Sequence, residues 1–181
     1  MERVSLPADG APTGRVNAYL LGEDPALLLD PGVRHPALDR AVATRSVGHV
    51  AVTHAHRDHA GAVAHYAAET GATVWARRGR EARFEAATGV APDRTFAEGD
   101  RIGGLNVLDT PGHAPDHVAF EAPDGILVGD LVRASGSVAV AHPEGDVRAY
   151  LVALRRLLAR DPPRLYPGHG PVVDDPEATV H

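Results

Sequence analysis

The amino-acid sequence predicts an α/β fold built of layers, in one domain that spans residues 1–181. Two observations support this prediction. Short apolar segments that resemble strands are interleaved with amphipathic helical segments along the whole chain, a pattern typical of sheets covered by helices. Of the 181 residues, 44% are hydrophobic and 23% are charged, which is an ordinary globular composition on a chain long enough to bury a core.

The first half of the chain is expected to open with a β-hairpin and to continue with alternating helices and strands. Two apolar runs flank the turn sequence Gly22-Glu23-Asp24-Pro25, which indicates paired strands. Glycine commonly follows the last residue of a helix, so a helix is expected to end before Gly71. The expected elements are strands 17–21 and 26–29, helix 35–44, strand 49–52, helix 60–70 and strand 73–76.

The second half is expected to add four strands and two helices. The expected elements are an arginine-rich helix 79–88, strands 101–109, 118–121 and 126–128, helix 146–160 and a last strand 164–166. Helix 146–160 has the clearest 3.6-residue periodicity, and Pro162-Pro163 ends it. Its expected apolar side consists of Val147, Tyr150, Leu151, Leu154, Leu157 and Leu158.

Charge and hydropathy exclude several classes of protein. The net charge is −6 with histidine neutral, which disfavours a protein that binds nucleic acid over its whole surface. No apolar run approaches the roughly 18 residues of a membrane-spanning helix, and the first residues lack the apolar core of a signal peptide. We therefore expect a cytoplasmic protein with no membrane partner. Cysteine is absent, so thiolate ligands are excluded.

The most informative segment is Thr53-His54-Ala55-His56-Arg57-Asp58-His59, which places three imidazoles and a carboxylate within six positions. Three further candidate ligands each stand beside a turn downstream, namely His113, Asp130 and His169. Nitrogen and oxygen donors of this kind suit zinc, with iron or manganese as alternatives. Seven ligands exceed the needs of one tetrahedral ion but suit two ions that share a bridging group. The sequence therefore predicts two metal ions per chain, with zinc as the favoured metal.

Each candidate ligand follows an expected strand. His54 and His56 are two residues apart after an apolar strand, so their side chains can point the same way and bind one ion. Asp58 and His59 lie where the chain turns toward the next helix and can face a second ion. Loops at the ends of strands are a common location for functional sites, because a rigid sheet fixes their positions.

These motifs resemble those of the metallo-beta-lactamase superfamily over nearly the whole chain. THAHRDH fits the HxHxDH signature, and TPGH, VGD and PGHG follow in the superfamily's order. The resemblance implies a four-layer αββα sandwich. It also implies the ligand sets: His54, His56 and His113 for one metal, Asp58, His59 and His169 for the other, and Asp130 as the bridge.

Within the superfamily, the chain looks closest to the lactamase-like hydrolase and endoribonuclease branch, with glyoxalase II as a near cousin. Members of that branch usually continue past PGHGPVV into a helical C-terminal region, whereas this sequence ends at His181. We therefore expect a less covered site with weaker substrate selectivity.

The expected reaction is hydrolysis, because zinc can lower the pKa of bound water from about 15.7 to about 7 and so supply a hydroxide nucleophile. Asp58 is expected to orient this hydroxide, and Asp130 to hold the ions and help to pass a proton to the leaving group. The favoured substrate is a small ester or thioester, as in glyoxalase II. Two alternatives remain open: an endoribonuclease that cuts single-stranded RNA, and an iron-dependent redox protein such as a sulfur dioxygenase.

Several other polar residues have two interpretations. Asp30 ends an apolar strand and is either a turn carboxylate or an acceptor that orients a ligand histidine. His117 is expected to support the site rather than to bind metal, and His142 to lie in a surface loop rather than to face substrate. His35, His49 and His65 belong to no motif. The basic run of Arg77, Arg78, Arg80 and Arg83 is expected to be a solvated helix face, with an anionic-substrate patch as the alternative.

Overall fold

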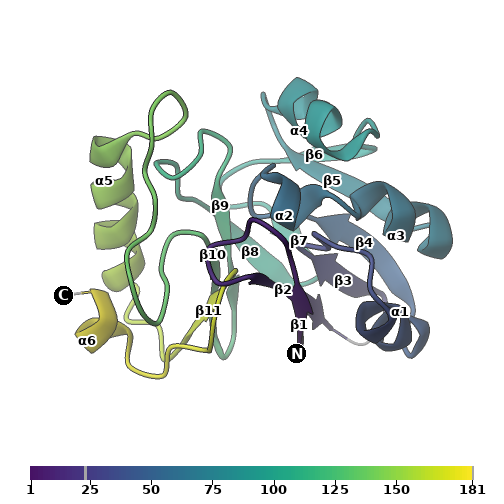
Figure 1. Cartoon of the computed structure of the whole chain (residues 1–181), viewed down its shortest axis with the longest axis horizontal. Helices are drawn as coiled ribbons and strands as arrows, with labels where there is room; N and C mark the ends of the chain where they lie inside the picture. Colours follow the sequence, from purple (N-terminus) through teal and green to yellow (C-terminus); the bar gives the residue numbers. More distant parts are fainter. Residues whose placement is uncertain (23, 181) are drawn as a thin grey trace.

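Two β-sheets lie face to face at the centre of the computed structural model, which describes residues 1–22 and 24–180 (Figure 1). The first sheet contains β1 (Glu2–Pro7), β2 (Arg15–Leu21), β3 (Ala26–Leu29), β4 (Val47–Ala51), β5 (Thr73–Arg77) and β6 (Arg94–Phe96), in that order. The second sheet has the order β11 (Leu165–Pro167), β10 (Gly125–Gly129), β9 (Val118–Ala122), β8 (Leu105–Asp109) and β7 (Arg101–Ile102).

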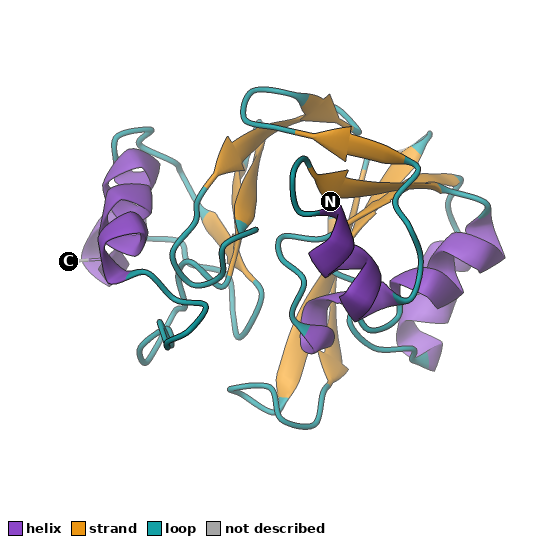
Figure 2. Ribbon diagram, turned by 90° about the horizontal axis from the view of Figure 1, so that it is seen from above, coloured by secondary structure: helices purple, strands orange, loops and turns teal. Residues whose placement is uncertain are grey.

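Helices cover the outer faces of both sheets. On the side of the first sheet lie α1 (Pro36–Ala43), α2 (Arg57–Ala60), α3 (Val63–Thr70) and α4 (Glu81–Thr88). On the side of the second sheet lie α5 (Val147–Leu158) and the short α6 (Pro176–Val180). Figure 2 shows the strands enclosed between the two sets of helices. None of the helices in the described residues is long and apolar enough to cross a membrane.

Alternation along the strands creates three apolar layers between the four layers of backbone. In β3, Leu28 packs with the helices outside the first sheet, whereas Leu27 and Leu29 pack between the sheets. In β10, Leu127 faces the space between the sheets and Val128 packs in the cluster that contains residues of α5. Successive side chains of a strand point to opposite faces, so each sheet is buried on both sides. The expected αββα sandwich is confirmed.

Two expected elements are wrong in their boundaries. The expected helix 60–70 is two helices, because the Ala62 N–H donates to the Pro31 carbonyl (2.9 Å) and leaves the helical pattern. The expected strand 101–109 is a hairpin of β7 and β8, because Gly103 and Gly104 both have positive φ (55° and 86°) and form its turn. Residue Glu23 of the expected first hairpin turn lies outside the described residues.

The expected apolar side of α5 is also partly wrong. Leu157 is buried and Tyr150 and Leu154 pack against the core, but Val147 and Leu151 are 58% and 48% exposed. Ala153 is buried instead. The buried face of α5 is therefore rotated about the helix axis relative to the face that the periodicity predicted. The strands β1 and β6 and the helix α6 were not expected. Asp146 is not in the helix but caps it, since its Oδ1 accepts from the Arg148 and Ala149 N–H groups.

Candidate metal centre

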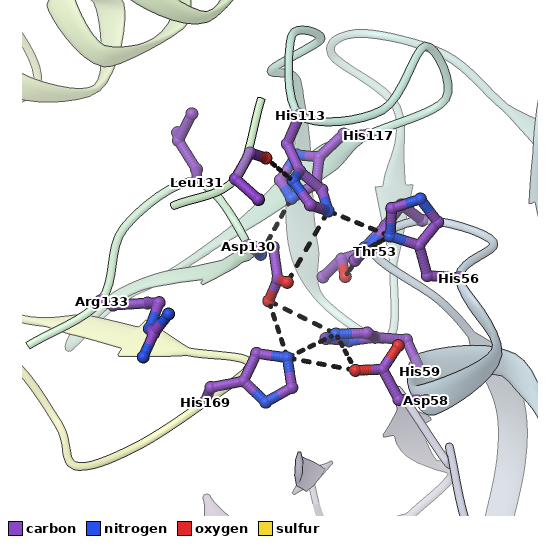
Figure 3. Close-up of polar contacts among 12 residues, drawn as sticks. Thr53, His56, Asp58, His59, His113, His117, Asp130, Leu131, Arg133 and His169 are labelled. Carbon is purple, nitrogen blue, oxygen red and sulfur yellow. Dashed lines mark hydrogen bonds and ion pairs between the residues drawn. The ribbon is translucent and has the colours of Figure 1, made fainter. Parts of the chain in front are cut away.

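All seven predicted ligands meet at one place, where strands of both sheets end. Figure 3 labels all of them except His54. His54 and His56 follow β4 of the first sheet, and Asp58 and His59 lie in α2. His113, Asp130 and His169 follow β8, β10 and β11 of the second sheet. β8 and β10 each pair antiparallel with β9, and β11 runs parallel to β10, so these three strands end at the same edge.

The first group of ligands consists of three imidazoles. His56 Nδ1 lies 2.9 Å from His54 Nε2 and 3.0 Å from His113 Nε2. Two donors about 2.1 Å from one tetrahedral zinc ion are roughly 3.4 Å apart, so this spacing suits a shared ion. The atoms that converge are therefore Nε2 of His54 and His113 and Nδ1 of His56.

The second group combines two imidazoles and a carboxylate. His169 Nε2 lies 3.3 Å from both His59 Nε2 and Asp58 Oδ2, and the His59 Nε2 atom is 3.8 Å from the same carboxylate oxygen. His59 and His169 are buried, whereas the Asp58 side chain is 23% exposed. The carboxylate of Asp58 therefore stands at the solvent side of this group.

Asp130 lies between the two groups. Its Oδ1 atom is 3.3 Å from both His59 Nε2 and His169 Nε2, and its Oδ2 atom is 3.7 Å from His113 Nε2 (Figure 3). The carboxylate therefore presents one oxygen to each group, which is the geometry required of a bridging ligand. The bridging role that the resemblance implies for Asp130 stays a prediction.

The donors fit divalent cations. The Asp130 Oδ1 atom is buried but accepts no hydrogen bond from any described residue. An unsatisfied buried carboxylate oxygen is costly, and a cation beside it removes that cost. The nitrogen lone pairs that converge in the first group likewise need a shared cation or proton. The residues present therefore fit two ions of the kind that nitrogen and oxygen donors bind.

The other ring nitrogen of each ligand histidine is also bonded. Partners of this kind fix the tautomer and the ring orientation of a metal-binding histidine. They are Thr53 Oγ1 for His54 (3.1 Å), Glu144 Oε2 for His56 (3.0 Å), Asp30 Oδ2 for His59 (3.0 Å), the Ala139 carbonyl for His113 (2.7 Å) and the Arg15 carbonyl for His169 (2.6 Å). In each of the five candidate ligand histidines, the ring nitrogen that points away from its group therefore has a hydrogen-bond partner.

The two groups differ in their protonation. Burial lowers the pKa of His54 well below its usual value, and burial also lowers the pKa of His113. Burial alone would lower the pKa of His59 too, but the Asp130 and Asp30 carboxylates raise it well above the usual value. For His169, the nearby carboxylates of Asp130 and Asp58 outweigh burial and raise the pKa to about 9. Protons therefore compete with a cation mainly in the second group.

Comparison with known proteins agrees with this geometry. Residues 11–169 match the family model described as the metallo-beta-lactamase superfamily. The chain belongs to the metallo-beta-lactamase superfamily. The match covers all seven candidate ligands of the metal centre and both sheets except β1.

Relatives of this chain include one protein named as a hydroxyacylglutathione hydrolase and one named as a thioesterase. A hydroxyacylglutathione hydrolase of Methylobacillus flagellatus is 35% identical over 115 residues, which are 61% of this chain and 44% of that protein. The thioesterase pkgB of Emericella nidulans is 30% identical over 166 residues, which are 87% of this chain and 46% of that protein. The aligned part is thus less than half the length of either relative.

One solved structure is similar to this chain over nearly the whole length of both proteins. The crystal structure of TTHA1623 in a di-iron-bound form has a TM-score of 0.77 and 33% sequence identity, and the match covers 96% of this chain and 94% of that chain. The likeness therefore extends over both sheets and the helices that cover them.

Two residues that the sequence left ambiguous have definite places in this superfamily site. The Asp30 carboxylate contacts His59, as above, and so orients a ligand candidate. His117 lies outside the ligand groups: its Nε2 atom accepts from the Asp130 N–H (3.1 Å) and its Nδ1 atom lies 2.8 Å from Thr110 Oγ1. Burial lowers the pKa of His117 to about 3, so the ring is neutral and can accept this bond. His142 is exposed in the loop before α5.

Two glycines are needed beside Asp130. A Cβ atom on Gly168 would meet Asp130 Oδ1 at 2.8 Å and His59 Cε1 at 2.5 Å. A Cβ atom on Gly129 would meet Thr53 Oγ1 at 2.6 Å, and this glycine has a φ of 47°. Glycine alone avoids these contacts, which explains why the ligands Asp130 and His169 each follow a glycine.

The basic run does not form an anionic-substrate patch of free cations. Arg77 lies in β5 rather than on a helix, and its guanidinium binds Asp109 (2.6 and 3.0 Å). Arg78 pairs with Asp100 at 3.5 Å, and Arg83 pairs with Asp116 and Glu144. Three of the four guanidinium groups therefore form ion pairs with carboxylates. The expectation of one solvated helix face is also wrong, because the run spans β5, a turn and α4.

Sequence reasoning missed residues that support the ligands from a distance along the chain. Asp116 accepts from the Ala55 N–H (2.8 Å) between two ligand histidines, and Glu144 contacts His56. Asp116 stands inside the TPGHAPDH motif and Glu144 inside the AHPEGD segment, so each was visible as a carboxylate near a motif. Their partners were not visible, because 61 and 88 residues separate the members of each pair.

Proposed function

We propose that this chain is a metal-dependent hydrolase that cleaves a small-molecule ester or thioester with two divalent ions, zinc being the favoured metal. The observation that carries the proposal is the placement of Asp130, with one oxygen beside His59 and His169 and the other nearer His113. The relatives named as thioesterase and hydroxyacylglutathione hydrolase support the ester or thioester bond as the target.

The bound ions would supply the central chemistry by lowering the pKa of a water nucleophile and by stabilising negative charge on the substrate oxygen. Asp58 is the partly exposed carboxylate of the cluster, and we assign it the orientation of the attacking water. Asp130 is buried, and its backbone N–H donates to His117 Nε2. We assign Asp130 the transfer of a proton toward the leaving group.

A hollow of about 550 Å³ lies beside Asp58, and we assign it to the substrate. Arg34, Arg57 and Asp9 are among its lining residues. No described residue forms an ion pair or a side-chain hydrogen bond with the guanidinium of Arg34 or Arg57, whereas Arg77 and Arg83 are both paired. The lining also contains two carboxylates, Asp9 and Asp58. Because we assign Asp58 to a metal ion, Arg34 and Arg57 face Asp9 alone, and this balance favours a substrate that carries an anionic group.

A redox function with iron is the second candidate, because the similar solved structure of TTHA1623 is a di-iron-bound form. The endoribonuclease alternative has less support. Three arginines of the basic run are paired with carboxylates, and the net charge is −6. Metal analysis of protein purified without chelator would separate iron from zinc.

The test is a panel of substrates on protein loaded separately with zinc, iron and manganese. Neutral and anionic thioesters, matched oxygen esters and single-stranded RNA would be compared with the Asp130→Asn variant as the inactive control. Thioester or ester cleavage that this substitution removes would support the proposal. Cleavage of RNA alone, or oxidation of a sulfur substrate only by the iron-loaded form, would replace it with one of the alternatives.

A further inference from the structure

The loop at residues 134–146, between β10 and α5, contacts the three-histidine group twice. The Ala139 carbonyl lies 2.7 Å from His113 Nδ1, and Glu144 Oε2 lies 3.0 Å from His56 Nε2. Both contacts reach the ring nitrogen that faces away from the proposed ion. The loop therefore contacts two of the three imidazoles in this group on the side away from the proposed ion.

Glu144 is itself fixed by Arg83 of α4. The Arg83 Nη1 and Nη2 atoms donate to Glu144 Oε1 (2.8 Å) and Oε2 (2.7 Å), which is a two-pronged contact. Such pairs restrict both the position and the plane of the carboxylate. Glu144 Oε2 thus accepts from Arg83 and from His56 at once, and the guanidinium orients the oxygen that faces the imidazole.

A second carboxylate joins the same arginine to the ligand-bearing loop. Arg83 Nε donates to Asp116 Oδ1 (2.9 Å), and Asp116 Oδ2 accepts from the Ala55 N–H (2.8 Å). Ala55 lies between His54 and His56 in the chain. Arg83 is therefore connected to this segment by two carboxylates. Asp116 bonds the backbone of the segment, and Glu144 contacts the His56 side chain.

We propose that Glu144, held by Arg83, is a positioning residue for His56. The inference rests on the proposed metal-dependent function. A carboxylate at Nε2 favours the tautomer in which Nε2 carries the hydrogen, and this leaves the Nδ1 lone pair free toward His54 and His113. Without Glu144, the imidazole can rotate or carry its hydrogen on Nδ1, which would block the three-histidine group.

The alternative is an ordinary surface ion pair that only fastens the loop. Exposed ion pairs contribute little to stability, and Arg83 already has Asp116 as a partner. A loop-fastening role predicts no change in metal affinity once the fold is intact. The two roles are therefore separated by metal binding and do not require a known substrate.

The experiment is competitive zinc titration against a chromophoric chelator, on the full chain after metal removal. We expect Glu144→Ala to weaken the ion bound by the three-histidine group about 10- to 100-fold and to leave the other ion nearly unchanged. Arg83→Met should shift the affinity in the same direction by a smaller factor. Glu121→Ala is the matched control, because Glu121 pairs with Arg160 (2.8 Å) in a strand that provides no ligand.

If the alanine variant folds poorly, a second variant, Glu144→Gln, and the visible spectra of cobalt-substituted protein test the same role. The glutamine side chain retains an acceptor for His56, so it should restore part of the affinity. Substituted cobalt should show a changed visible spectrum in Glu144→Ala. Unchanged zinc affinity in a folded Glu144→Ala protein, or an equal loss in Glu121→Ala, would overturn the inference. Absence of ester hydrolysis with the expected affinity pattern would instead reject the proposed function alone.

Discussion

The Asp30 carboxylate fixes the ligand candidate His59, with its Oδ2 atom 3.0 Å from His59 Nδ1. The same carboxylate accepts from the Thr53 N–H (2.6 Å) and hydroxyl (2.8 Å), immediately before His54. Asp30 is buried and has a φ of 54°, an unusual backbone conformation for a residue with a side chain. One carboxylate at the end of β3 thus connects segments that supply ligands to both groups.

Asp30→Asn should weaken the ion bound by Asp58, His59 and His169. Asparagine tolerates the left-handed backbone, but an NH2 group in place of Oδ2 can accept neither from His59 nor from the Thr53 hydroxyl. We expect a loss of zinc affinity of about 10- to 100-fold at this group, measured by chelator competition. Asp39→Asn is the control, since Asp39 accepts from Tyr66 (2.8 Å) away from the seven ligands. Equal affinities for the Asp30→Asn and wild-type proteins would contradict a role in orienting His59.

Asp130→Asn should remove one of the two ions and most of the activity. The substitution keeps the shape of the side chain but removes the charge between two cations. We expect about one metal per chain and a fall in the hydrolysis rate of at least about 100-fold. Elemental analysis and kinetics on the same preparation provide both values. Two bound metals with full activity would rule out a bridging role for Asp130.

Metal binding should depend on pH differently in the two groups. Carboxylates raise the pKa of His169 to about 9 and the pKa of His59 well above its usual value, so protons compete with the ion for these two imidazoles. Affinity at this group should therefore rise with pH up to about 9, and protons should be released when the ion binds at pH 7. The three-histidine group should show a weaker dependence, since the pKa values of His54 and His113 are lowered.

Calorimetry in buffers of different ionisation enthalpy measures these protons directly. Titration of the wild type should resolve one ion that binds with large proton release and one that binds with little. The His169→Ala variant should lose most of the larger release. Identical proton release for both ions would show that the two groups do not differ as their pKa shifts indicate.

Arg57→Ala should reduce the preference for anionic substrates. Arg57 lines the hollow beside Asp58, and an exposed charge contact of this kind contributes about 1 kcal/mol, or roughly a fivefold change in kcat/KM. A pair of thioesters that differ by one carboxylate would separate this effect from a general loss of activity. Arg78→Ala is the control, because Arg78 pairs with Asp100 and does not line the hollow. An equal effect of Arg57→Ala on both thioesters would place the anion elsewhere.

The seven side chains that the sequence singled out come together in the structure, and their signals in the sequence are local. The spacing of His54, His56, Asp58 and His59 lies within one segment, and the turns that carry the other three ligands follow recognisable strands. The layered fold followed from the interleaved strand and helix patterns. The predicted ends of helices were wrong where a single contact determines them. One example is the Ala62 N–H, which donates to the Pro31 carbonyl rather than to a helical partner.

The supporting residues could not be predicted because their roles depend on distant partners. Arg83 appeared only as part of a basic run, yet it pairs with Asp116 and Glu144, which lie 33 and 61 residues further along the chain. Likewise, the exposed Val147 and Leu151 fit a helical repeat, but the packing of α5 against the second sheet selected Ala153 instead. Periodicity describes one helix, whereas burial depends on its neighbours.

The most direct test of this account is the metal content of the wild-type protein after purification without chelator. Two groups of ligands joined by Asp130 require about two ions per chain, as zinc or as iron or manganese in its place. Elemental analysis with an independent protein concentration, before and after equilibration with zinc, gives the number. We expect about two equivalents. A reproducible value of one after equilibration, with all seven ligands intact, would contradict the two-ion centre.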